Sequence, residues 1–147
     1  METFLSLVGD TDQNNEDLSE IENRMSGYIN PGLVRYFAEL SSFNRPPEAI
    51  NRVTSSMMLI LYPECENTWI EAKKKLKNFK AFTELLIKTQ NEKKPIRRDR
   101  MNQVETILLR TPNLANQIKN ISVAGHSLYL WIVDFIQILK LRSKLNN

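Results

Sequence analysis

Apolar residues recur at three- and four-residue spacings along most of this chain, with polar residues between them. Leu18, Ile21 and Met25 show the spacing near the N-terminus. Because side chains three and four positions apart share one face of an α-helix, the pattern predicts amphipathic helices and an all-α fold. The expected helices cover residues 18–29, 33–43, 48–61, 69–77, 79–89, 101–108, 114–121 and 122–145.

Proline, glycine and capping residues mark the ends of these helices. Asn30-Pro31-Gly32 ends the first, and Pro46-Pro47 ends the second, since a proline moves the residue before it out of the helical region. Thr68-x-x-Glu71 has the capping-box pattern, which satisfies two backbone donors at a helix start. Each of these signals predicts a sharp turn between short helices.

The predicted architecture is a compact bundle of about six short helices. We expect its first and last helices to pair as an antiparallel coiled-coil stem that leaves the bundle. The last helix offers an apolar stripe for that stem, and Phe37, Leu40 and Phe43 are its natural partners. The expected segments are a polar acidic tail (1–16), N-terminal helices with the incoming stem helix (17–43), the bundle (44–127) and the outgoing stem helix (128–147).

The net charge of +3 is unevenly spread along the 147 residues. Residues 1–30 contain seven acidic side chains and one basic one, whereas the rest of the chain is basic. A basic body favours an acidic partner: nucleic acid, an anionic membrane or an acidic protein surface. A solvated basic surface with no partner is the other interpretation. The apolar run 128–139 contains Asp134 and Gln137 and is too short to cross a membrane, so we expect no membrane partner.

Few residues suit catalysis or ligand binding. A single His126 makes neither a metal site nor a catalytic triad. Cys65 has no partner for an internal disulfide, which indicates a reducing compartment, and glutamates on both sides disfavour its thiolate. No phosphate-binding glycine loop is present. We therefore expect a protein that is not an enzyme and needs no cofactor.

The order of several motifs resembles the microtubule-binding tip of the dynein heavy-chain stalk. The resemblance covers residues 33–145 and depends on the Pro-Pro pair, the tryptophan that starts a short helix, and the Ser-Ala-Leu-Trp series of the last helix. The residues concerned are Pro46, Pro47, Trp69, Ser122, Ala124, Leu128 and Trp131. It implies a helical domain that binds tubulin in the cytoplasm and cytoskeleton, or in the cilium or axoneme. The rest of a dynein heavy chain, or other dynein subunits, would be further partners.

The resemblance also implies which residues would contact tubulin. It places the start of the first bundle helix, the loop after the second helix and the start of the last helix near the microtubule. The candidate contacts are Arg45, Arg52, Lys77, Arg97, Arg98, Arg100, Lys119 and Asn120. Solvated surface charge is the alternative for each. Lys73, Lys74 and Lys75 point about 100° apart on a helix, so they do not form one basic face.

Some positions depart from the family pattern. Asn120 and Ile121 stand where a basic residue is usual, Leu130 precedes the tryptophan, and Ser41 replaces a base in the incoming helix. These departures motivate a second hypothesis, a helical adaptor that keeps the fold but binds another protein. An exposed apolar patch at Tyr129, Leu130 and Phe135 would favour it. Nucleic-acid binding lacks a helix-turn-helix or an aromatic platform, so we expect no nucleic-acid partner.

Overall fold

The structure, a computed structural model, describes residues 11–146 of the chain, and the side chains of residues 18–143. This part is all-helical, with no strand, and it contains eight α-helices, so the expected bundle of about six short helices is not confirmed. The helices are α2 (Thr11–Met25), α3 (Val34–Leu40), α4 (Glu48–Leu61), α5 (Trp69–Lys77), α6 (Phe79–Glu92), α7 (Arg98–Val104), α8 (Leu114–Ile121) and α9 (Val123–Asn146). A short 3₁₀ turn, η1 (Pro31–Leu33), precedes α3, and a π-helical turn, η2 (Glu105–Leu109), follows α7.

The helices begin at the residues whose chemistry predicts it. Asn30 accepts a hydrogen bond from the backbone N–H of Gly32 at 2.9 Å, and Pro31 opens η1. Thr68 accepts one from Glu71 at 3.2 Å, so α5 begins at Trp69 as the capping box predicted. Ser122 accepts one from Gly125 at 2.9 Å before α9. Local sequence therefore determines most of the helix boundaries.

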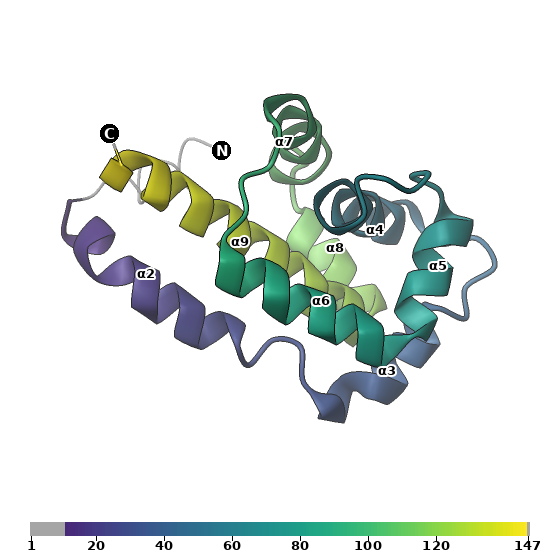
Figure 1. The fold of residues 1–147 in the computed structure, drawn as a ribbon. Helices are drawn as coiled ribbons and strands as arrows, with labels where there is room; N and C mark the ends of the chain where they lie inside the picture. Colours follow the sequence, from purple (N-terminus) through teal and green to yellow (C-terminus); the bar gives the residue numbers. More distant parts are fainter. Residues whose placement is uncertain (1–10, 147) are drawn as a thin grey trace.

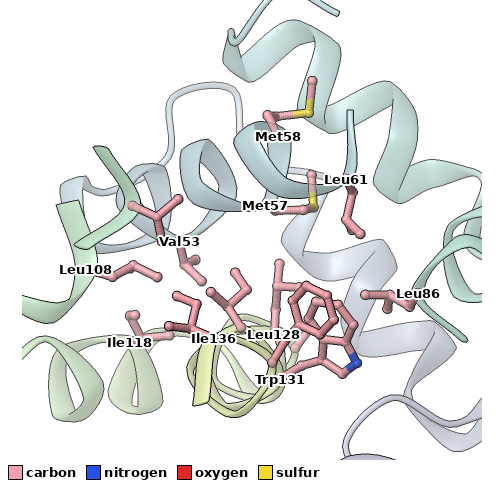
Figure 2. Close-up of a cluster of buried hydrophobic side chains, with 14 of the residues drawn as sticks. Val53, Met57, Met58, Leu61, Leu86, Leu108, Ile118, Leu128, Trp131 and Ile136 are labelled. Carbon is pink, nitrogen blue, oxygen red and sulfur yellow. The ribbon is translucent and has the colours of Figure 1, made fainter. Parts of the chain in front are cut away.

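Helix α9 runs through the molecule, and four other helices pack on it (Figure 1). Its contacts are with α8, α2, α4 and α3. Figure 2 shows side chains of α4, α6 and α8 converging on Leu128, Trp131 and Ile136 of α9. The core is therefore built on one long helix that is covered on several sides.

A stem that leaves the bundle is not confirmed by the described residues. Every residue of α9 from Leu128 to Leu141 is buried or half-buried. The physical reason is that this stretch is apolar on all sides, and such a helix is stable only when it is enclosed. The incoming helix, expected over residues 33–43, is also shorter, because α3 ends at Leu40.

Helix α2 occupies much of the surface of α9 that a stem would expose. It lies along α9 in the opposite direction, with Ile21 and Met25 fully buried against the core (Figure 1). It begins at Thr11, so residues 11–16, predicted as part of a polar tail, are helical. Residues 1–10 of that tail lie outside the described part of the chain.

Candidate functional site

Two of the predicted contact residues, Lys119 and Asn120, line one hollow at an end of the molecule, and a third, Arg45, lies in the loop beside it. The end of α3 and Phe43 line a hollow of about 330 Å³ with Lys119, Asn120 and the first residues of α9. Arg45 follows Phe43 by two residues in the same loop, and Arg45, Lys119 and Asn120 are all exposed. We call this end the α8–α9 end; it consists of residues 41–47 and 119–123.

Three structural residues hold the loop of the α8–α9 end in place. The indole N–H of Trp69 donates to the carbonyl oxygen of Phe43 at 3.0 Å, which ties the loop to the start of α5. Pro47 precedes the first turn of α4 in an extended conformation, so the chain reverses there. Trp69 and Pro47 thus shape this loop, and the structural role expected of Pro46 stays a prediction.

Close packing of α9 on α4 fixes the other side of this end. A Cβ atom added to Gly125 would lie 3.0 Å from Cδ1 of Ile50 and 3.2 Å from Cγ2 of Ile118. Only glycine lets these three helices approach so closely. Leu128, one turn further along α9, is fully buried. The glycine was not identified from the sequence, because nothing local distinguishes it from a helix-weakening residue.

Arg52 lies in the first half of α4 and is bound within the molecule. Its Nη1 donates to the carbonyl oxygen of Ile107 at 3.2 Å and to Oγ1 of Thr111 at 3.1 Å, and its Nε pairs with Glu48 at 3.0 Å. Thr111 itself donates to Ile107 at 2.8 Å. These bonds join α4 to the π-helical turn η2, where carbonyl groups are left open. The prediction of Arg52 as a tubulin contact remains, but its side chain also stabilises the fold.

The arginines of α7 lie far from the α8–α9 end. Arg100 donates to the carbonyl oxygen of Pro63 at 3.2 Å, just beyond the C-terminus of α4, whereas Arg45 precedes its N-terminus. A 14-residue helix spans about 20 Å. Arg97 pairs with Asp99 at 2.9 Å, and Arg98 is exposed. The predicted contacts of α7 are thus separated from those of the α8–α9 end.

The lysines of α5 point in different directions, as the helical spacing predicted. Lys74 pairs with Glu71 at 3.1 Å, and the Lys75 ammonium lies 5.1 Å from the ring centroid of Tyr62. Lys73 and Lys77 line a groove between α5 and α3, whereas Lys119 and Asn120 line the hollow of the α8–α9 end. Lys77 is therefore not adjacent to Lys119 or Asn120.

A polar network between α2, α6 and α9 was missed in the sequence. Asp134 of α9, almost fully buried, accepts two hydrogen bonds from Arg24 at 3.0 Å and one from Tyr28 at 2.8 Å. A signal was available, because a carboxylate inside an apolar helix needs a partner, but the sequence does not say which base supplies it. Burial, with the bond to Asp134, raises the pKa of Tyr28 to about 12. The bond to Asp134 likewise raises the pKa of Arg24, which keeps its guanidinium charged.

The same network continues through Trp131. Its indole N–H donates to Oε1 of Gln90 at 3.2 Å, and its ring stacks on Phe135 with 5.0 Å between centroids. Gln90 donates to the carbonyl oxygen of Glu22 at 3.5 Å, and the Glu22 carboxylate pairs with Lys93. Trp131 is thus a core residue that also joins α9 to α6, in keeping with the structural role expected of it.

The remaining candidate groups do not assemble into a chemical site within the described residues. His126 stands on α9 near Lys119, and burial together with this positive charge lowers its pKa below the usual 6.5. In residues 11–146 no group of His, Cys, Asp and Glu is arranged to hold a metal ion. None of the helices described there is long and apolar enough to cross a membrane.

The apolar patch that would have favoured an adaptor at Tyr129, Leu130 and Phe135 is not on the surface. Phe135 is completely buried, and the other two are half-buried. Burial raises the pKa of Tyr129, in agreement with this position.

Comparison with known proteins gave no match, either to a protein-family model, to a curated protein or to a solved structure.

Proposed function

We propose that this chain is a non-catalytic microtubule-binding domain that docks on tubulin through the α8–α9 end. The observation that supports it most is that exposed Lys119 and Asn120 line one hollow with Phe43, whose loop carries the exposed Arg45 two residues later. Basic side chains grouped in this way would meet an acidic protein surface, speed the encounter and set its orientation. Tubulin enters the proposal through the likeness of the motif order to the dynein stalk tip.

The arrangement of α2, α3 and α9 supports a modified form of the stem in this proposal. Both α2 and α3 pack on α9. The Asn30 cap and Pro31 separate α2 from α3, so the incoming half of the stem would consist of two consecutive helices instead of one. The stem of this proposal is short, interrupted and enclosed by the bundle.

Co-sedimentation with polymerised microtubules at low and near-physiological salt tests the proposal. We expect the chain to pellet with microtubules, and the affinity to fall with salt because the contacts are exposed charges. Changing Arg45→Glu and Lys119→Glu together should weaken binding about tenfold, since two exposed pairs become repulsive. Arg52 is a poor probe, because changing it would also break its bonds to η2.

The matched control is the double change Lys88→Glu and Lys94→Glu. Both lysines are exposed and lie at the C-terminal part of α6 and the loop after it. The control alters net charge equally, so its affinity should stay within about twofold of the original. Equal loss in both variants would reject the α8–α9 end as the docking site. A folded chain that does not pellet even at low salt would reject microtubule binding and make the helical adaptor the better hypothesis.

A further inference from the structure

A second surface, which shares Ser41 and Ser42 with the α8–α9 end, is a groove lined by basic and apolar side chains. It measures about 380 Å³ and lies between α3 and α5, closed at one side by the start of α6. Its volume is within the range of about 300–1,000 Å³ typical of ligand sites. The lining residues are Val34, Ala38, Ser41, Ser42, Lys73, Leu76, Lys77 and Phe79.

Two helix faces line this groove. Val34 and Ala38 lie four residues apart on α3, Ser41 directly follows that helix, and Leu76 and Lys77 lie three and four residues after Lys73 on α5. Residues three and four positions apart share one helix face. The groove therefore lies between two helices, as in sites that take a peptide segment.

The floor of the groove is apolar and partly open to solvent. Val34, which lines the groove, is 50% exposed. Phe79 is held in place by Phe37, with 5.3 Å between ring centroids, and Leu76 below is buried. An apolar side chain of a ligand could cover Val34 and Phe79 without any rearrangement of the core.

The charged side chains that line the groove are all positive. Lys73 and Lys77 are the ionisable residues of the lining, which includes no carboxylate. Within the described part of the chain neither ammonium group lies within ion-pair distance of a carboxylate, whereas Lys74 between them pairs with Glu71. Both lysines are therefore available to a negatively charged partner.

We propose that the groove binds a short acidic peptide segment that presents an apolar side chain. The apolar side chain would lie over Val34 and Phe79, and flanking carboxylates would meet Lys73 and Lys77. This site goes beyond the proposed microtubule docking and does not depend on it, because none of its residues belongs to the set Arg45, Lys119 and Asn120.

Fluorescence anisotropy tests this proposal with three labelled probes. The first is a nine-residue peptide of glutamates with Phe-Leu at its centre; in the second, serines replace the Phe-Leu; the third is a single-stranded oligoribonucleotide. We expect saturable binding of the first probe. Binding of the other two should be at least about tenfold weaker, since each lacks the apolar contact or the carboxylates.

Two variants locate the binding in the groove. Lys73→Glu with Lys77→Glu should weaken binding of the first peptide about tenfold, whereas the charge-matched Lys88→Glu with Lys94→Glu should change it less than about twofold. Ala38→Trp fills the groove without altering charge and should also abolish binding. Ala38 is exposed on α3, and far-UV circular dichroism would verify that each variant stays folded.

Four outcomes would overturn the proposal. These are no saturable binding of the first peptide, equal binding of the serine peptide, equal or tighter binding of the oligoribonucleotide, and equal losses in the two double variants. Microtubule co-sedimentation of the same proteins separates the two proposals, because the groove variants leave the α8–α9 end unchanged.

Discussion

The two side chains of the ion pair between Arg24 and Asp134 differ in their exposure to solvent. The Arg24 side chain is 52% exposed, whereas that of Asp134 is 12% exposed. Water can therefore replace Asp134 around the guanidinium, but it cannot easily reach the carboxylate. A buried charge that has lost its partner costs more than an exposed one.

We therefore expect Arg24→Met to lower the free energy of unfolding more than Asp134→Asn does. The first change leaves the Asp134 carboxylate with Tyr28 alone and should cost about 1–3 kcal/mol, while the methionine keeps the apolar stem. Asp134→Asn keeps a side-chain oxygen that accepts from Tyr28, and it leaves the Arg24 guanidinium without its carboxylate but in contact with water. Urea denaturation at neutral pH measures both, and the opposite order would contradict this account.

His126 gives a pH dependence of known sign. Its pKa in the folded chain is below 6.5, through burial and then through Lys119. The unfolded chain therefore binds the proton more readily, so this contribution to stability is present above pH 6.5 and is lost as the pH falls below it. Urea midpoints at pH 7.5 and 5.5 should differ more for the original chain than for His126→Gln. An equal pH dependence in both would exclude this role.

At the scale of elements, Gly125 controls how closely α9 approaches α4. Gly125→Ala should destabilise the chain by about 1–3 kcal/mol, because the new methyl would press on Ile50, which is completely buried. This outweighs the gain of up to about 1 kcal/mol that alanine brings to a helix interior. Gly27→Ala is the matched control: its nearest neighbour would be a backbone oxygen at 3.7 Å, so thermal unfolding should change little or rise.

Most element boundaries could be predicted from local signals, and the pairing of elements could not. Pro31, the Pro46-Pro47 pair and the Thr68 cap act on their own neighbours, so their effects are visible in the sequence. The position of α2 on α9 depends on the contact of Arg24 with Asp134, 110 residues apart. No local pattern encodes such a partner.

The candidate site, too, could be predicted from the sequence only in part. Arg45, Lys119 and Asn120 were named from the motif order, and the structure places them at one end. The internal bonds of Arg52 and the groove beside Lys73 depend on how α4 and α5 pack on other helices, which the spacing of lysines and arginines does not determine.

For the whole molecule, α2 is held to the core less firmly than α9. The described part of α2 has two fully buried apolar side chains, Ile21 and Met25, whereas the described part of α9 has eight. Local opening occurs where few apolar contacts hold an element. Hydrogen exchange should therefore be faster in α2 than in α9, and Arg24→Met should accelerate α2 alone. Equal acceleration throughout would show that the two helices unfold as one unit.

The antiparallel arrangement of α2 and α9 also determines how the chain would respond to mechanical load. The first turn of α2 and the last turn of α9 lie at the same end of the molecule (Figure 1). A force applied to these two ends would separate α2 from α9 one turn at a time, because the contacts between the two helices would bear the load one after another. Single-molecule force spectroscopy should record this as a low-force first step, before the enclosed part of α9 gives way. A single step that unfolds the whole chain at once would contradict it.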